Sequence, residues 1–327
     1  MRVLPDTLSA ALMARVTRAV RGDLDRSAME AVTGERQDVT RAVNGQLGQV
    51  HRLRRTLDEA QAVGARLAVA QSRMTTAAAA LSAMRTSTEG LGLEALNAAV
   101  AGGATGVGAF AETARETLKG VASQLNTRFD GRSLFAGAAA DGPAVAPGEA
   151  ILAELDTLGA GLSAAGRGAA IEAYFAPGGG YDAAYRGAST DAGEAALPDG
   201  GALPGLPRAD DEAVRTLLKG LALIAAAGDV PETQAAGLAN RGAEALRAAS
   251  EGLTAWEARL GHASERIAAA EARWADEVRV TGETLARLTG RDGFEAASEV
   301  QQLESRLEAA YALTARLSRL TLTSFLR

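Results

Sequence analysis

Histidines are the residues of this chain that could most simply bind a metal ion, and the sequence contains only two, His51 and His262. A zinc site within one chain usually draws on preorganised spacings such as HExxH, and neither histidine stands in one. The chain has no cysteine, so disulfide and thiolate chemistry are both excluded. We therefore interpret both histidines as solvent-facing or structural residues of long helices. The sequence predicts no metal site and no cofactor.

A glycine-rich segment at residues 102–108 comes nearest to a phosphate-binding loop. It lacks the GxxxxGKS or GxxxxGKT pattern, and no GxGxxG sequence follows a predicted strand. Carboxylates usually lie beside arginines, as Glu265 does beside Arg266, which is typical of a solvated helix face. Without a convergent polar site, the sequence predicts a protein that is not an enzyme and has no catalytic residues. An enzyme with a divergent site in residues 138–209 is an open alternative that no group of residues supports.

The composition favours helices over a conventional globular core. The 327 residues are 47% hydrophobic but only 4% aromatic, and much of the apolar content is alanine, the residue with the highest helix propensity. The formal net charge is −6, and no basic stripe is interleaved with aromatic residues, so nucleic-acid binding is not expected. The sequence contains no run of about 18 apolar residues, so insertion into a membrane is not expected. Residues 1–6 lack the apolar region of a cleaved signal peptide.

Two stretches carry apolar residues at alternating three- and four-residue steps, residues 39–84 and residues 294–322. This spacing is typical of helices that pack lengthwise against partners. Further helices are predicted at residues 6–32, 109–128, 149–163, 210–227 and 232–289. A loop with short helical pieces is expected at residues 86–108, and a loop at residues 187–209. Asp292, with Glu295 three residues later, predicts an N-cap at the start of the last helix.

Short strands are predicted at two places. Asp130 and Gly131 form a typical hairpin turn between β-prone residues. A few strands are also expected around the glycine turns near Tyr174, Phe175, Tyr181 and Tyr185. The predicted fold is therefore mainly α, with long antiparallel helices, coiled-coil pairing of the N- and C-terminal helices, a β-hairpin and a small mixed or β outer domain from the middle of the chain.

Changes in composition predict three parts. Residues 1–38 with 294–327 form a terminal coiled-coil assembly domain, and residues 39–137 with 210–293 form a helical rod domain that carries the hairpin. Residues 138–209, rich in Gly, Ala and Pro, form a variable outer domain. A free terminal helix is marginal in water because most helical stability comes from packing. We therefore expect the termini to be largely disordered in the isolated chain and to fold on assembly.

Several segments resemble the bacterial flagellin superfamily. The most specific is residues 126–137, which read NTRFDGRSLFAG and are similar to the family's Asn-x-Arg and Gly-Arg-Tyr-Leu-Phe-Gly elements. The motif residues are Asn126, Arg128, Gly131, Arg132, Leu134, Phe135 and Gly137. The tail, residues 317–326, is most similar to that of the hook–filament junction proteins, the third of the hook-associated proteins. Two departures are Ser133, where the family often has an aromatic residue, and the absence of the family's acidic segment near residue 38.

The resemblance covers residues 1–138 and 210–327 and implies a structural axial protein of the bacterial flagellum, needed for motility. It implies export by the type III secretion apparatus, with an export chaperone and no cleaved signal, to an extracellular location. There the protein would join the hook to the filament by self-association in a helical tube, beside a hook-associated protein and flagellin. The expected assembly seam consists of Leu8, Leu12, Val16, Val300, Leu303, Leu307, Leu317 and Leu320. Two alternatives stay open, flagellin as the bulk filament subunit and, from another class, a cytosolic coiled-coil adaptor.

Overall fold

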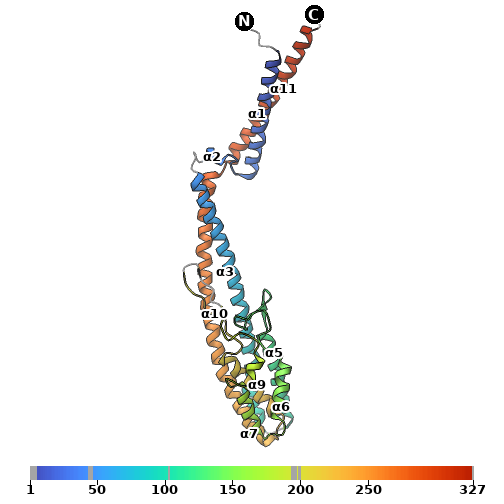
Figure 1. Cartoon of the computed structure of the whole chain (residues 1–327), viewed down its shortest axis with the longest axis vertical. Helices are drawn as coiled ribbons and strands as arrows, with labels where there is room; N and C mark the ends of the chain where they lie inside the picture. The colour runs from blue at the N-terminus through green and yellow to red at the C-terminus, as the bar shows by residue number, and fades with distance from the viewer. Residues whose placement is uncertain (1–5, 43–46, 102–103, 193–196, 198–199, 326–327) are drawn as a thin grey trace. The chain divides into compact units, whose positions relative to one another are not determined.

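The computed structural model of the chain describes residues 6–42, 47–101, 104–192, 197 and 200–325, except the side chains of residues 6–10, 41–42, 99–101, 104–107, 232 and 317–325. The helices are α1 (Asp6–Thr33), α2 (Val39–Ala42), α3 (Leu47–Thr88), α4 (Leu91–Ala101), α5 (Ala104–Leu125), α6 (Gly148–Gly159), α7 (Ala164–Phe175), α8 (Tyr181–Ala184), α9 (Glu212–Ala227), α10 (Glu232–Thr289) and α11 (Gly293–Phe325). Strands β1 (Arg128–Phe129) and β2 (Arg132–Ser133) pair antiparallel. The prediction of a mainly α fold with a β-hairpin is confirmed (Figure 1).

The chain forms two compact units. Unit 1 consists of Met1–Ala62 with Trp274–Arg327, and unit 2 consists of Val63–Arg273. Helices α3 and α10 are long enough to contribute residues to both units. The three-part division expected from the sequence remains a prediction.

In unit 1, the first and last helices pack against each other, α1 in blue and α11 in red in Figure 1. The chain turns that follow α1 and precede α11 are hydrogen-bonded to one another. The backbone nitrogen of Arg36 donates to Thr289, 2.9 Å away, and that of Arg291 donates to Gly34, 2.8 Å away. Because the end of α1 thus lies beside the start of α11, the two helices run antiparallel. The predicted pairing of the N- and C-terminal helices is confirmed.

In unit 2, α9 lies at the centre of the core, packed against α5 and α7. All its residues from Gly220 to Ala227 are buried. Glycines bring α9 close to α10, since a Cβ on Gly242 would lie 2.6 Å from Ile224 Cγ1 and one on Gly220 would lie 2.8 Å from Leu246 Cδ2. Close approach of small residues therefore supplies packing in a chain that has few aromatic residues.

The strands expected around residues 174–185 were a wrong prediction. Phe175 ends α7 and Tyr181 begins α8, and Tyr185 forms an isolated bridge with Val145. The ring of Phe175 lies 5.0 Å from that of Tyr174 and 5.2 Å from that of Tyr181. Aromatic residues that suggested strands instead pack against one another within a helical layer, where their large area is buried.

Residues 86–108 were expected to be a loop with short helical pieces. The helical pieces are present, but loop as the main state was wrong for the described part of the segment, because α3, α4 and α5 cover most of it. Gly90, with φ +83°, separates α3 from α4. Gly92 lies inside α4, where a Cβ would lie 3.0 Å from the Cα of Ala243 on α10. Glycine at this position therefore reflects close helix packing rather than a flexible loop.

Candidate assembly surface

Helix α1 carries two different rows of side chains. The row that is covered as α1 packs on α11 has alternating four- and three-residue steps and consists of Met13, Thr17, Val20, Leu24, Ser27 and Ala31. Such steps are those of a coiled-coil interface. A second row, displaced by one residue, contains Leu12 and Val16, whose side chains are 62% and 45% exposed. Leu12 and Val16 therefore lie outside the contact between the two helices.

Helix α11 has one covered row, Ala296, Val300, Leu303, Leu307 and Ala310. The structure thus brings three predicted seam residues, Val300, Leu303 and Leu307, onto the covered face of the pair, with Leu303 the most buried of them. The side chains of Leu8, Leu317 and Leu320 lie outside the described residues. Whether these residues form a seam between copies remains a prediction.

Sequence reasoning missed the covered row of α1 because two of its residues, Thr17 and Ser27, are polar. A search by apolar type alone follows Leu12 and Val16 instead. The regular four–three spacing that starts at Met13 is the signal that could have identified the covered row.

The helix pair leaves large apolar side chains in contact with water. Val32 and Phe294 are each 85% exposed, and Met29 is 58% exposed. Tyr311 is partly exposed and lies beneath the guanidinium of Arg21, whose Cζ is 5.6 Å from the ring centroid. Two helices packed only on each other can cover one face apiece, so further apolar side chains need another partner to be buried.

The end of α1 and the start of α11 meet at a set of contacts that we call the joint. Arg291 lies at its centre. The Arg291 guanidinium forms an ion pair with Glu299, and its Nε and Nη1 lie 3.7 Å from Glu30 and 3.8 Å from Glu295. Glu30 is buried and also accepts a hydrogen bond from the backbone nitrogen of Gln37, 2.9 Å away. One arginine therefore holds carboxylates from both helices of the pair.

In unit 2, the motif of residues 126–137 forms the hairpin and the entry to the middle segment. Asp130 and Gly131 have φ of +50° and +73°, the geometry of a type I′ turn. The predicted hairpin turn is therefore present. The side chain of Asn126 pairs with the backbone of Val145 as a neighbouring strand would. Its Nδ2 donates to the carbonyl oxygen of Val145 (3.1 Å), and its Oδ1 accepts from the nitrogen of Val145 (3.0 Å).

The second half of the motif is buried where the chain enters the middle segment, residues 138–209. Leu134 and Phe135 are buried, and the carbonyl oxygen of Phe135 accepts a hydrogen bond from the nitrogen of Ala209, 2.8 Å away. Gly137 has φ +61°, and a Cβ there would lie 2.6 Å from the carbonyl oxygen of Thr190. The buried residues and the glycine therefore serve local folding. The hydroxyl of Ser133 is buried and, among the described residues, has no hydrogen-bond partner.

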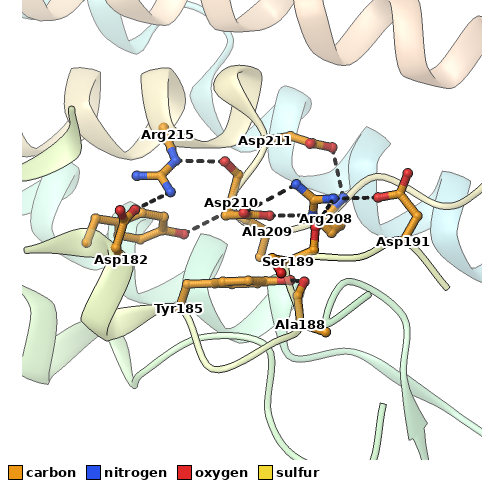
Figure 2. A network of polar contacts seen from close by, with 11 residues as sticks. Asp182, Tyr185, Ala188, Ser189, Asp191, Arg208, Ala209, Asp210, Asp211 and Arg215 are labelled. Carbon is orange, nitrogen blue, oxygen red and sulfur yellow. Dashed lines mark hydrogen bonds and ion pairs between the residues drawn. The ribbon is translucent and has the colours of Figure 1, made fainter. Parts of the chain in front are cut away.

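A polar network fixes the returning part of the middle segment (Figure 2). Arg208 lies at its centre, with Nε 2.7 Å from Asp210 and Nη1 2.6 Å from Asp191. Its backbone nitrogen donates to Asp211, 2.8 Å away. A second arginine, Arg215 of α9, forms an ion pair with Asp182 of α8. The Nε of Arg215 also donates to the carbonyl oxygen of Asp210, 2.7 Å away, so the network links Asp191 and residues 208–211 to α8 and α9.

The electrostatics of the network are those of a structural cluster. The hydrogen bonds from Arg215 and from the backbone of Gly178 hold the pKa of Asp182 below its ordinary value. Burial raises the pKa of Asp211, and burial raises the pKa of Tyr185 to about 12. The Tyr185 hydroxyl donates to the carbonyl oxygen of Ala188, 2.9 Å away. The hydroxyl is therefore fully protonated at neutral pH and serves as a fixed hydrogen-bond donor.

The described part of the chain offers little that resembles a binding site for a small molecule. A hollow of about 500 Å³ beside α7 and α9 is lined by charges of both signs, but its Glu172 pairs with Arg241 and its Asp210 with Arg208. No group of three or more His, Asp or Glu side chains suited to a metal ion occurs among the described residues. None of the helices described is both long and apolar enough to cross a membrane.

Comparisons with known proteins find similarity among the solved structures. No family model matches the sequence, and no curated protein matches it. The crystal structure of FlgL from Bacillus cereus is similar over 76% of this chain and 98% of that chain, with 15% sequence identity and a TM-score of 0.35. A likeness at this level carries no argument about function, which must come from the residues themselves.

Proposed function

We propose that this chain is a structural axial protein of the bacterial flagellum that joins the hook to the filament by helical self-assembly. The observation that carries the proposal is the terminal helix pair α1–α11, which covers one row of each helix and leaves Leu12, Val32 and Phe294 largely exposed. The resemblance of residues 126–137 to the flagellin superfamily supports it from the sequence.

The physical argument concerns the area left in water. Full burial of a Leu, Val or Phe side chain contributes about 1.5–3 kcal/mol relative to exposure. An isolated pair with Val32 and Phe294 each 85% exposed forgoes that gain. Neighbouring copies in a tube would bury these side chains and so recover the burial free energy, because each copy presents the same exposed side chains to the next. Assembly therefore stabilises the pair, and in the isolated chain we expect residues 1–38 and 294–327 to be largely disordered.

Circular dichroism tests this last expectation. The full chain is compared with a chain that lacks residues 1–38 and 294–327. We expect the truncation to remove much less helical signal than the number of deleted residues would give. A loss in full proportion would mean that the terminal helices are already formed before assembly.

The remaining parts of the proposal follow from the same role. The protein would be exported by the type III secretion apparatus, aided by a chaperone, and would lie outside the cell between another hook-associated protein and flagellin. Residues 138–209 would form the outer domain, residues 39–137 with 210–293 the rod, and the two termini the assembly domain.

The decisive experiment is deletion of the gene, followed by electron microscopy of the cells and an assay of flagellin in the medium. Bare hooks with flagellin shed into the medium are expected for a junction protein. Intact hooks with no filament protein in the medium would instead identify the chain as flagellin. Normal filaments would contradict both and would favour the cytosolic adaptor.

A further inference from the structure

Charge is divided unevenly along the terminal helix pair of unit 1. The joint holds one end of the pair and the helices run antiparallel, so residues 11–22 of α1 lie beside residues 305–316 of α11. These two ranges, which we call the outer half, contain five arginines and one glutamate. Residues 23–36 and 291–304, which we call the inner half, contain three arginines and eight carboxylates. The formal charge is therefore +4 in the outer half and −5 in the inner half.

The outer half of α1 combines free positive charge with exposed apolar side chains. Arg15, Arg18 and Arg21 are all exposed, and none of them has a carboxylate partner among the residues that the structure describes. Leu12 and Val16 lie between and beside them in sequence and are 62% and 45% exposed. This part of α1 therefore offers a partner two apolar side chains next to arginines whose charge is not neutralised within the chain.

A groove along α11 lies mostly in the inner half. Its volume is about 380 Å³, and Phe294, Ser298 and Gln302 are among the residues that line it. The large ring of Phe294 is 85% exposed there. Two glutamates and one arginine also line the groove, within a half of the pair that is acidic overall. An apolar segment with basic neighbours therefore suits this groove better than an acidic segment would.

The groove is out of reach for the outer half of α1 in the same copy. Residues 11–22 lie beside residues 305–316 of α11. Leu12 and Ser298 are thus separated along the pair by roughly 25 Å, which is about 17 residues at 1.5 Å each. An α1 segment that fills the groove must therefore come from another molecule.

We propose that the outer half of α1 in one copy docks in the α11 groove of a second copy, with the two helix pairs parallel and shifted along their axes by about 25 Å. The inference rests on the proposed self-assembly and identifies one contact within it. The shift places the basic half of one pair beside the acidic half of the next, whereas pairs without a shift would place like charges side by side. Because groove and occupant are different surfaces of one chain, the contact can repeat from copy to copy.

Cross-linking tests the contact directly, because the natural chain has no cysteine. A chain with Leu12→Cys and Ser298→Cys is recovered from sheared flagella and treated with a bismaleimide too short to join the two positions within one copy. A series of linked dimers, trimers and larger products is expected, since each copy would be linked to one neighbour through each cysteine. The matched control replaces Leu12→Cys by Ala14→Cys, which is also exposed but lies on a different face of α1, and should give no series.

An exchange of charges gives a second measurement on the full chain. Arg15→Glu should reduce the protein recovered in the flagellar fraction by about tenfold, the scale of one attractive contact that becomes repulsive. Gln302→Arg in the groove should also reduce recovery, and the two changes together should restore part of the loss. Arg66→Glu is the control and should leave recovery unchanged. Arg66 is exposed and has no carboxylate partner in the described part of the chain, but it lies on α3, outside the helix pair.

The outcomes separate the two proposals. If the natural chain is absent from the flagellar fraction, the proposed function is wrong. If the chain is present but the cysteines at positions 12 and 298 give no linked product, this contact is wrong while the function stands. Products that stop at the dimer would indicate antiparallel neighbours and would also overturn it. So would normal recovery of Arg15→Glu, or a double variant recovered no better than either single variant.

Discussion

Arg36 donates a hydrogen bond from its Nε to the carbonyl oxygen of Gly290, 3.1 Å away and 254 positions later in the sequence. The contact joins the turn that follows α1 to the turn that precedes α11. The same two turns are also linked by backbone hydrogen bonds. The terminal helices are therefore held at their inner ends by a defined joint and not by their apolar faces alone.

The first prediction concerns Arg291 in this joint. Arg291→Ala leaves the buried Glu30 without its cation, and Glu295 and Glu299 without theirs. Because the terminal helices are expected to fold on assembly, the loss should appear in the assembled protein, as about 1–3 kcal/mol per copy, below the cost of breaking a fully buried pair. Urea dissociation of sheared flagella, with the released protein quantified, measures it. Arg279→Ala is the control, because its pairs with Asp276 and Glu283 are exposed and should cost at most about 1 kcal/mol.

A second prediction separates backbone strain from steric overlap. Gly137 and Gly161 both have positive φ, +61° and +73°, so alanine is strained at either position by about 1–2 kcal/mol. A Cβ at Gly137 would also lie 2.6 Å from the carbonyl oxygen of Thr190, whereas one at Gly161 would contact nothing within 4 Å. Gly137→Ala should therefore destabilise clearly more than Gly161→Ala in thermal unfolding. Equal effects would mean that the segment near Thr190 moves aside at no cost.

The third prediction concerns pH. The folded chain depresses the pKa of Asp182, so this carboxylate contributes stability above its ordinary pKa and loses it as pH falls through the lowered value. Burial raises the pKa of Asp211, so its contribution has the opposite sign and declines as pH rises through the raised value. Asp182→Asn should weaken the loss of stability in acid, and Asp211→Asn should not. Urea midpoints between pH 3 and pH 7 give both curves, and identical curves would refute the assignment.

The fourth prediction distinguishes contacts within the chain from contacts between chains. Leu303 is buried in the helix pair and Leu12 is 62% exposed. Leu303→Asp should disrupt the pair itself, because an unpaired charge in an apolar contact costs several kcal/mol. Leu12→Asp should leave the helical content of the isolated chain unchanged and still prevent recovery in the flagellar fraction. Normal assembly of Leu12→Asp would remove Leu12 from the seam.

Local signals in the sequence predicted the long elements well. The helix predicted at residues 232–289 has those bounds in the structure, because its apolar pattern is continuous between Pro231 and Gly290. Asp292 was predicted as an N-cap, and its Oδ1 accepts hydrogen bonds from the nitrogens of Phe294 (2.8 Å) and Glu295 (3.1 Å). Caps and turns depend on a few neighbouring residues, so the sequence alone contains them.

Features that depend on distant partners were not predictable in the same way. Tyr174 and Phe175 fit a strand or a helix equally well until the ring of Tyr181 packs on that of Phe175. The choice of Asp191 and Asp210 as partners of Arg208 depends on the path of the intervening chain.

The hydrogen bond between Phe135 and Ala209 also bears on how such a chain can change over evolution. It joins Phe135, just before the middle segment of residues 138–209, to Ala209, the last residue of that segment, with 2.8 Å between the carbonyl oxygen and the nitrogen. The chain therefore enters and leaves the segment at neighbouring points. Length gained or lost in the loops between its helices need not separate those points, provided that α6 and α7 keep their packing on α5 and α9.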